Sequence, residues 1–278
     1  MEIQKKPVLF GLSATPTKLI HWTLLLTPFL IVLAVYSYNS HLRHIDNPMD
    51  KILPNIEQVS TAIQEYAFQK DARTDKNLFI DDTLTSLRRI GIGMLLSTLI
   101  SLFLGLNMGL FRGLSSLLNP FVTALSMIPP LAVLPIILIS FGVGEVAKVF
   151  LIFFGTVLLM TRSIYLAVKE IPQEQIIKAR TLGASQWQVV YQVIMPQILP
   201  KLIDNVRLAF GSAWIFLIAA EAIAANSGLG YRIFLKRRYL AMDLIIPLTI
   251  WISVLGIFID AFFAKLVQKK FSWYGVKK

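Results

Sequence analysis

Residues 171–196 read Ile171-Pro-Gln-Glu-Gln-Ile-Ile-Lys-Ala-Arg-Thr-Leu-Gly183-Ala184-Ser-Gln-Trp-Gln-Val-Val-Tyr-Gln-Val193-Ile-Met-Pro196, and this mostly polar stretch separates two strongly apolar segments. Even extended to residue 200, it lacks the roughly 20 consecutive apolar residues that a membrane-spanning helix needs. A chain this apolar is expected to keep such a stretch only where it contacts something outside the membrane. The segment therefore predicts a docking site for a soluble partner.

The remainder of the chain has the composition of a polytopic membrane protein. Of its 278 residues, 55% are hydrophobic and only 15% are charged, a balance unlike that of an ordinary soluble domain. The first apolar segment begins too late, and is too long, for a cleaved signal peptide, so we expect it to be retained. The expected fold class is all-α with about six transmembrane helices, at residues 19–38, 90–111, 119–141, 147–168, 203–225 and 244–267.

Composition also limits the chemistry that the chain can perform. It has no cysteine, which excludes disulfides and thiolate metal sites. Its three histidines, His21, His41 and His44, have no spacing that suits a metal or a catalytic base, and no cofactor-binding motif is present. No GxxxxGK[ST] phosphate loop occurs, so we predict that the chain is not an enzyme and that a partner hydrolyses any ATP. The net charge of +11 is scattered through loops, which indicates membrane topology rather than nucleic-acid binding.

The distribution of basic residues favours placing both termini in the cytoplasm. The short loop between spans five and six opposes this orientation, because it places Arg232, Lys236, Arg237 and Arg238 outside. The long first loop mixes both signs of charge, and long loops carry little weight. We therefore expect a multi-pass protein of the cell inner (plasma) membrane, surrounded by lipid, with fourteen cations on its inner side: Lys5, Lys6, Lys18, Arg112, Arg162, Lys169, Lys178, Arg180, Lys201, Lys265, Lys269, Lys270, Lys277 and Lys278.

The chain divides into tails, a peripheral span, an outer loop and a transmembrane core. Apolar residues recur at helical spacing in the outer loop, at Ile52, Ile56, Val59, Ile63 and Tyr66. This pattern predicts a short amphipathic helix that lies on the membrane face or its neighbours, or contacts a receptor. The expected boundaries are a cytoplasmic tail (1–18), a first transmembrane helix (19–38), an outer loop (39–83), a core (84–268) that contains the docking segment (171–200), and a basic cytoplasmic tail (269–278).

Span three is interrupted by prolines: Pro120, Pro129, Pro130 and Pro135 fall within sixteen residues. Each proline removes a backbone donor and disfavours helix at the preceding residue. Because unpaired carbonyls are costly in lipid, we expect this backbone to face protein or a watery cavity. Two interpretations stay open. Pro129, Pro130 and Pro135 either line a translocation pathway, as broken helices do in many transporters, or form a packing kink.

Ionisable residues inside the spans are candidates for function or for internal pairing. Asp204 and Arg207, near the inner end of span five, are three residues apart and can pair on one helix face. Glu221 lies deeper in span five and Asp260 lies within span six, and an acid within a membrane is by default a functional hypothesis. Glu221 is a pathway candidate that would contact substrate, with an ion pair or hydrogen bond to a neighbouring helix as the alternative.

The docking segment has the pattern of two short helices joined by a turn. Pro172 suits the start of the first helix, Gly183 permits the turn, and Pro196 and Pro200 mark the entry to span five. An apolar stripe of Trp187, Val190 and Val193 is expected on the second helix. We predict that the residues around the turn project from the inner face as a rigid lever, namely Ala179, Arg180, Thr181, Leu182, Gly183 and Ala184.

These residues resemble the EAA motif of bacterial ABC importer permeases, in which Glu-Ala-Ala, three residues, Gly, nine residues and Ile-x-Leu-Pro follow one another. The match comprises Gly183, the nine-residue spacing, Val193 and Pro196, with Ala179 retained from the opening triplet. The sequence departs from the motif at Ile177, where Glu is usual, and at Lys178, where Ala is usual. The resemblance implies that this segment docks a cytoplasmic ATP-binding cassette ATPase without the usual acidic contact.

Five further stretches resemble, in order along the chain, the nitrate/sulfonate/taurine branch of these permeases. They are Thr83-x-x-Ser86-Leu-Arg88, Ile128-Pro-Pro-Leu-Ala132, Phe141-Gly-x-Gly-Glu145, Ala219-Ala-Glu221 and Ser227-Gly-Leu-Gly230. The resemblance implies a type I importer fold with a cytoplasmic coupling helix. It also implies a second permease copy in a homodimer, two ATPases beneath it, and a periplasmic or lipid-anchored substrate-binding protein.

We therefore expect the permease subunit of an ATP-binding cassette importer for a small polar solute. The solute is nitrate-, sulfonate-, taurine- or bicarbonate-like, or it is a small nitrogen compound such as urea or guanidine, because residues 232–243 resemble, more weakly, permeases of urea- or guanidine-carboxylase systems. Glu221, with no evident membrane partner, mildly favours a cation such as guanidinium. The alternative is a stand-alone ion-coupled carrier or channel, which would need charged relays in several spans or inverted repeats. A membrane anchor for an assembly is a third class, and it would not need the interrupted span.

Overall fold

The computed structural model describes residues 17–274 except residue 49, residues 69–74 and residue 76. Within these residues the chain is helical, and five helices are long and apolar enough to cross a membrane. They are α1 (Lys18–Asp46), α3 (Leu78–Leu110), α6 (Glu145–Lys169), α9 (Met195–Ala224) and α11 (Met242–Lys270). Two shorter helices, α4 (Arg112–Ser126) and α5 (Pro130–Phe141), can together form a sixth, broken span. The expectation of an all-α protein with about six spans is confirmed, although residues 1–16 and 275–278 of the two predicted tails lie outside the described residues.

Two helices extend well beyond the apolar segments that predicted them. Helix α1 continues to Asp46, and α3 begins at Leu78 rather than near residue 90. The start of α3 is capped by Asn77, whose side-chain oxygen accepts a hydrogen bond from the backbone N–H of Ile80 at 3.1 Å. The polar first turns of α3 face other helices rather than lipid, so hydropathy alone does not reveal them. The predicted amphipathic helix is present as α2 (Ile56–Phe68).

The interruption predicted in span three is confirmed. Helices α4 and α5 meet at an angle of 95° across residues 127–129. Pro129 precedes the first turn of α5, and Pro130 occupies that turn, where a missing backbone donor is tolerated. Pro120 and Pro135 lie inside α4 and α5. The paired prolines therefore set the position of the elbow.

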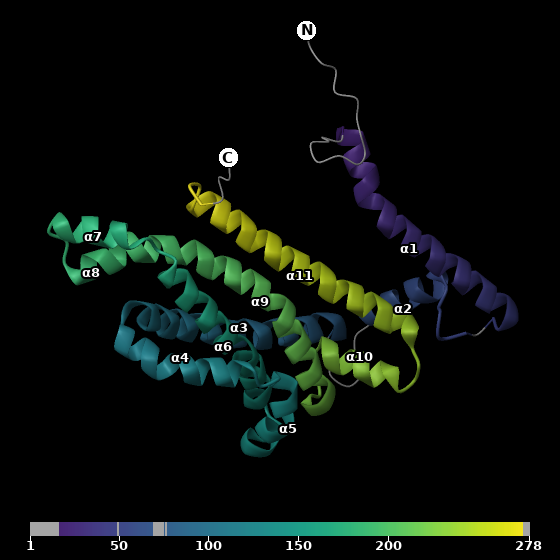
Figure 1. Cartoon of the computed structure of the whole chain (residues 1–278). Coiled ribbons are helices and arrows are strands. Elements are labelled where there is room, and N and C mark those ends of the chain that lie inside the picture. The colour runs from purple at the N-terminus through teal and green to yellow at the C-terminus, as the bar shows by residue number, and fades with distance from the viewer. Residues whose placement is uncertain (1–16, 49, 69–74, 76, 275–278) are drawn as a thin grey trace, which may run out of the picture.

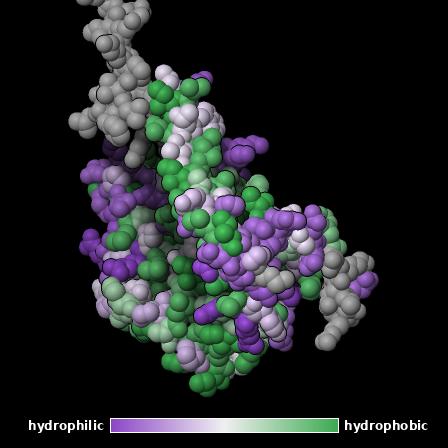
Figure 2. All heavy atoms as spheres, turned by 90° about the vertical axis from the view of Figure 1, so that its right-hand side faces the viewer, coloured by the Kyte–Doolittle hydropathy of each residue, from purple (hydrophilic) through white to green (hydrophobic). Residues whose placement is uncertain are grey.

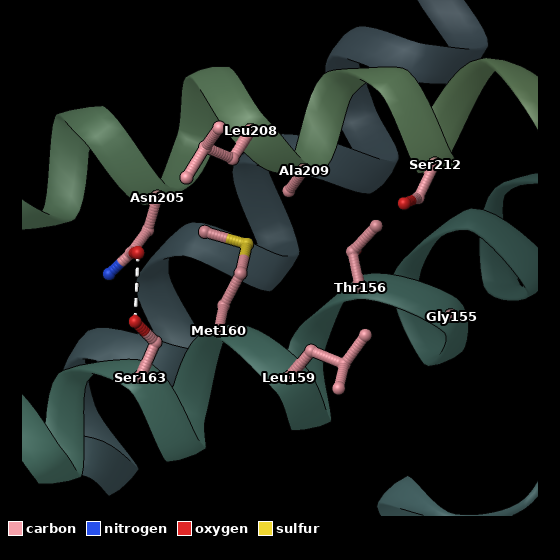
Figure 3. Close-up of a pocket in the computed structure, with 9 residues that line it drawn as sticks. All are labelled: Gly155, Thr156, Leu159, Met160, Ser163, Asn205, Leu208, Ala209 and Ser212. Carbon is pink, nitrogen blue, oxygen red and sulfur yellow. Dashed lines mark hydrogen bonds between the residues drawn. The ribbon is translucent and has the colours of Figure 1, made fainter.

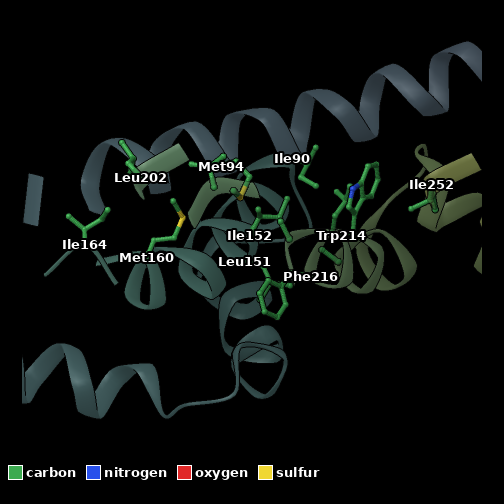
Figure 4. Packing of buried hydrophobic residues seen from close by; sticks show 14 of the residues in the cluster. Ile90, Met94, Leu151, Ile152, Met160, Ile164, Leu202, Trp214, Phe216 and Ile252 are labelled. Atoms are coloured by element: carbon green, nitrogen blue, oxygen red, sulfur yellow. The ribbon is translucent and has the colours of Figure 1, made fainter. Parts of the chain in front are cut away.

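The core of the protein is formed where α6 packs between α3 and α9, as Figure 4 shows. Ile152 and Ile164 of α6 and Leu217 of α9 are fully buried there. The approach of α3 to α6 requires glycine, because a Cβ atom at Gly105 would lie 2.7 Å from the carbonyl oxygen of Thr161. Close packing of α6 therefore fixes the positions of both neighbouring helices.

Helix α1 stands apart from this core (Figure 1). No residue of its most apolar 18-residue window is buried. Its described contacts are mainly with the chain that follows it: Tyr36 donates a hydrogen bond to the carbonyl oxygen of Pro54 at 2.7 Å, and Arg43 pairs with Asp50 at 2.6 Å. An apolar helix of 29 residues is thus left facing lipid or another protein.

The two ends of α9 carry different structures (Figure 1). Helices α7 (Gln173–Thr181) and α8 (Gln186–Gln188) precede its N-terminal end, and α10 (Leu229–Arg237) follows its C-terminal end. Figure 2 views the molecule from the side on which α2 and the start of α11 lie, and hydrophilic side chains gather there beside hydrophobic surface. The polar segments therefore lie at opposite ends of the apolar core.

Candidate functional site

The turn after α7 has a defined backbone geometry, and hydrogen bonds cap the helices on both sides of it. Gly183 has φ +86°, and its N–H donates to the carbonyl oxygen of Arg180 at 2.9 Å, while the N–H of Ala184 donates to that of Ala179 at 3.1 Å. This pair of bonds is the Schellman arrangement, which favours glycine at the left-handed residue. Ser185 and Gln188 then form a capping box for the next helix. The predicted turn at Gly183 is present and pre-formed.

The helix after this turn does not stop before span five. Residues 189–194 form a π-helical turn (η1, Val189–Ile194), and the helix continues unbroken from Gln186 to Ala224. A π turn carries an extra residue and so shifts the face that is buried. Of the predicted apolar stripe, Val190 is buried and Val193 is half-buried, whereas Trp187 is 69% exposed and lies off the buried face.

The predicted docking residues form an exposed knob at this end of the molecule. Arg180, Thr181 and Gly183 are exposed, and Leu182 is 88% exposed, while Ala179 and Ala184 pack partly against the core. Lys201 of α9 pairs with Glu170, which directly follows α6, at 2.7 Å, and this pair joins the two helices that flank the segment carrying the knob. Lys201 also holds the pKa of the Glu170 carboxyl below its usual range. Exposed apolar side chains on a rigid polar segment are typical of a protein interface.

A cavity of about 220 Å³ opens between α6 and α9, and its mostly apolar wall carries four polar side chains (Figure 3). Thr156 and Ser163 on α6 and Asn205 and Ser212 on α9 contribute hydroxyl and amide groups to its wall. Each of these pairs is seven residues apart, so both members lie on one helix face. Ser163 donates a hydrogen bond to the Asn205 side-chain oxygen at 2.8 Å. Sequence reasoning missed this site, although the seven-residue spacing of small polar residues in two apolar spans was a usable signal.

The structure does not bring the predicted pathway residues together at this cavity. Pro129 and Pro135 are exposed and Pro130 is half-buried; Pro129 and Pro130 lie at the elbow between α4 and α5, and Pro135 lies inside α5. Glu221 is also absent from the residues that line the cavity. Glu221 is fully buried near the opposite end of α9 from the docking knob.

Glu221 is the centre of a buried polar network that joins three segments. Arg89 of α3 donates to its carboxylate at 2.7 Å, and Ser86 donates to both of its oxygens at 2.8 and 3.0 Å. The backbone N–H of Gly230 donates to it at 2.8 Å. Arg89 is 3% exposed, so both charges of this pair are removed from solvent. Every hydrogen-bonding oxygen of the buried carboxylate is thus satisfied.

Arg89 extends the network to α6. Its Nε and Nη2 atoms donate to the two oxygens of Glu145, each at 2.7 Å, in a bidentate pair. Lys148 also pairs with Glu145 at 2.9 Å. The remaining Nη1 bond of Arg89 reaches the carbonyl oxygen of Ser227 at 2.7 Å. One guanidinium therefore connects α3, α6, α9 and the turn before α10.

A second buried carboxylate holds α10 in place. Asp82 accepts hydrogen bonds from Arg232 Nε at 2.7 Å, from the backbone N–H of Gly228 at 2.7 Å and from the Tyr66 hydroxyl at 2.6 Å. Burial, followed by the charge of Asp82, raises the pKa of the Tyr66 phenol. Gly228 has φ +115°, and a Cβ atom there would collide with the Glu221 carboxylate. Four of the five stretches that resemble permeases of the nitrate/sulfonate/taurine branch thus meet at one place.

The ion pair corrects one inference from the sequence. Glu221 was expected to have no evident membrane partner, and its partner Arg89 is in fact supplied by the early turns of α3. Because Glu221 is already paired with Arg89, its charge does not favour a cationic solute. The expected pairing of Asp204 with Arg207 is confirmed at 3.1 Å, and Arg207 additionally forms a bidentate pair with Asp260 of α11 at 2.8 and 3.1 Å.

A proline-broken span, a rigid exposed turn leading into a long span, and a cavity with polar side chains beside that span are features of a transporter's membrane component. The model of the family described as "Binding-protein-dependent transport system inner membrane component" matches residues 97–272. The chain belongs to this family, and it is the multi-pass inner-membrane permease subunit of an ABC importer. Such permeases operate with a binding protein and with an ATPase that resides in a separate subunit.

Named relatives agree with this assignment. A putative ABC transporter permease protein of Methanocaldococcus jannaschii is 33% identical over 88% of this chain and 91% of its own length. The taurine transport system permease protein of Escherichia coli is 33% identical over 71% of this chain and 74% of its own length. The bicarbonate transport system permease protein of Synechococcus elongatus is 30% identical over 86% and 84%.

Solved structures of ABC importers share the fold. The inward-facing MetNI methionine ABC transporter matches with a TM-score of 0.61 at 19% identity, covering 69% of this chain and 95% of that one. A bacterial alginate ABC transporter, solved with an alginate pentasaccharide-bound periplasmic protein, matches with a TM-score of 0.61 at 14% identity, covering 91% and 96%. The type I importer fold is therefore shown.

Proposed function

We propose that two copies of this permease form the translocation pathway for a small polar solute, and that α7 and α8 dock an ATP-binding cassette ATPase. The continuity of one helix carries this proposal. The helix Gln186–Ala224 begins beside the docking knob and carries Asn205 and Ser212 to the wall of the cavity. Displacement of the knob therefore moves one wall of the cavity. The residues proposed to contact the ATPase are Ala179, Arg180, Thr181, Leu182, Gly183 and Ala184.

In this mechanism the ATPase moves the knob, and the long helix rocks with it as a rigid body. ATP binding biases the equilibrium between an inward-open and an outward-open arrangement through its different contacts in the two states. The chain has no phosphate-binding loop, so hydrolysis belongs to the partner and the permease is not itself an enzyme. The knob then faces the cytoplasm, and both termini lie on that side.

The isolated position of α1 supports a second copy of the chain. Side chains along α1 such as Phe29, Val32 and Leu33 are each more than 60% exposed, and the helix has no extensive contact with the described core. A second permease copy would cover part of this surface and would close the open side of the α6/α9 cavity. A homodimer is therefore the proposed assembly.

The lining of the cavity supports a solute recognised by hydrogen bonds. Its polar groups are hydroxyls and one amide, and none of its nine lining residues is ionisable. Such a wall lets a small polar solute pass without trapping it in a strong ion pair. Taurine, nitrate, sulfonates, bicarbonate, urea and guanidinium are all candidates, and the binding protein would supply most of the selectivity. The elbow at Pro129 and Pro130, together with Pro135 of α5, is proposed to border the pathway, and Glu221 is proposed to position the helices around it.

Reconstitution tests this function directly. The permease would be purified with its ATPase, placed in proteoliposomes with the binding protein outside, and supplied with each candidate solute in radiolabelled form. We expect uptake that requires both ATP and the binding protein. Uptake driven by an ion gradient, without the ATPase, would instead identify a stand-alone carrier.

A further inference from the structure

Three cations at the outer end of the molecule have no role in the function described so far. Arg232 is already paired with the buried carboxylate of Asp82. By contrast, no carboxylate among the described residues lies within ion-pair distance of Lys236, Arg237 or Arg238, which end α10. This group lies at the end of α9 away from the docking knob, where the positive-inside rule disfavours Lys and Arg in a short loop. The presence of three cations at this end therefore indicates a specific contact with another molecule.

The corner between α10 and α11 also exposes apolar side chains beside these charges. Tyr239 is 69% exposed and Leu240 is 55% exposed, and Arg237 and Arg238 are exposed next to them. Cations in the last turn of a helix offset its dipole, but this effect does not account for an adjoining tyrosine and leucine in solvent. Arginine and tyrosine together are enriched in the parts of protein interfaces that contribute most to binding.

The corner is held rigidly in this exposed arrangement. Leu240 has φ +54°, which is a strained conformation for a branched residue. The strain is maintained by backbone hydrogen bonds, since the N–H groups of Leu240 and Ala241 donate to the carbonyl oxygens of Arg237 and Lys236 at 3.1 and 3.2 Å. At the start of α10, Arg232 also lies over the Tyr66 ring at 5.5 Å. The surface is therefore pre-formed.

We propose that this corner, comprising Lys236, Arg237, Arg238, Tyr239 and Leu240, docks an acidic surface of the substrate-binding protein. The inference rests on the proposed function, and it names the surface that receives the partner on which the family depends. Charge complementarity selects an acidic partner, and the exposed Tyr239 and Leu240 beside the cations supply the aromatic and apolar contacts that are enriched in protein interfaces. The backbone N–H of Gly230 in α10 donates to Glu221. A force that the bound partner exerts on α10 is therefore passed to the buried network at the end of α9.

The test is a charge reversal with a matched control in the same chain. The complex of permease and ATPase is placed in nanodiscs, and its affinity for the binding protein encoded with the transporter is measured at several salt concentrations. We expect Arg237→Glu/Arg238→Glu to weaken binding about tenfold or more, because it replaces two ion pairs with two repulsions. The affinity of this variant should also depend less on salt concentration. Lys269→Glu/Lys270→Glu reverses two exposed cations at the other end of α11 and should leave binding unchanged.

Two further measurements identify the occupant. Tyr239→Ala should also weaken binding, because it removes the aromatic side chain that contacts the binding protein. Nanodiscs without anionic lipid should give the same losses as nanodiscs with it. Losses seen only with anionic lipid would assign the corner to lipid and overturn the proposal, as would unchanged binding in both variants. Basal ATPase activity should be retained throughout, which shows that the variants assemble. If the wild-type complex itself does not respond to the binding protein, the proposed function fails instead.

Discussion

Arg89 Nη1 lies 2.7 Å from Glu221 Oε1, and neither residue is more than 3% exposed. This pair joins α3 to α9, and Arg89 simultaneously holds Glu145 of α6. The helices that form the cavity wall are thereby connected at their ends by a single guanidinium. A lysine could not reproduce this geometry, because it offers a point charge rather than a planar fork.

Removing one member of this buried pair should destabilise the protein strongly. Arg89→Met leaves the Glu221 carboxylate buried without its cation, and we expect a loss of about 3–5 kcal/mol in the free energy of unfolding. The double variant Arg89→Met/Glu221→Gln should recover much of this loss, because no isolated charge remains. Unfolding of the purified protein in detergent measures both effects. Arg88→Met, at the exposed neighbouring position, is the control, and a double variant no more stable than Arg89→Met would contradict the account.

Glu221→Gln by itself tests whether the network matters for transport. The substitution keeps a hydrogen-bonding group beside Ser86 and Gly230 but removes the charge that Arg89 meets. We expect lower uptake in proteoliposomes with unchanged co-purification of the ATPase, because the network lies at the end of α9 away from the docking knob. Normal uptake would leave Glu221 with a purely structural role.

Substitution of Gly183 should separate the ATPase from the permease. At φ +86° the residue needs the left-handed region, which is costly for other amino acids and closed to proline. Gly183→Pro is expected to abolish uptake and to reduce co-purification of the ATPase. Gly211 lies in the interior of α9 with open space around it, so Gly211→Ala should leave both unchanged. Retention of ATPase binding by the proline variant would remove the docking role from this turn.

Filling the cavity between α6 and α9 should slow transport without disturbing assembly. Asn205→Leu removes the partner of Ser163 and adds an apolar group to the wall between α6 and α9. We expect uptake to fall several-fold, while ATPase co-purification and thermal stability are retained. Asn107→Leu is the control, because that amide bonds only within α3, to the carbonyl oxygen of Phe103. Equal uptake in the two variants would place the pathway elsewhere.

Alkaline pH should loosen the contact between α2 and α3. Burial and the Asp82 charge raise the pKa of Tyr66, so the folded protein favours the protonated phenol. This contribution to stability is complete below the ordinary tyrosine pKa of about 10 and is lost as pH rises beyond it. Tyr66→Phe should abolish this pH dependence and cost about 1.5 kcal/mol at neutral pH. Thermal unfolding measured across that range checks both, with Tyr38→Phe at an exposed position as the control.

The sequence revealed those parts of the site that depend on local spacing. Gly183 and its flanking residues predicted the docking turn because a Schellman turn is specified within six residues. The sequence did not reveal the π-helical turn at Val189–Ile194, because such a turn changes the register of a helix without leaving a mark in hydropathy. It also missed Thr156, Ser163, Asn205 and Ser212, because their significance depends on two helices facing each other.

The sequence by itself determined an all-helical membrane protein with a polar segment between two spans and a broken third span. These features follow from hydropathy, from the backbone chemistry of proline and from glycine's access to positive φ. Only the tertiary structure placed Arg89 between Glu145 and Glu221, which are 56 and 132 residues away along the chain. No periodicity encodes such a meeting, because it arises from the packing of α3 against α6 and α9. The sequence fixes which charges exist, and packing decides which of them can be buried as partners.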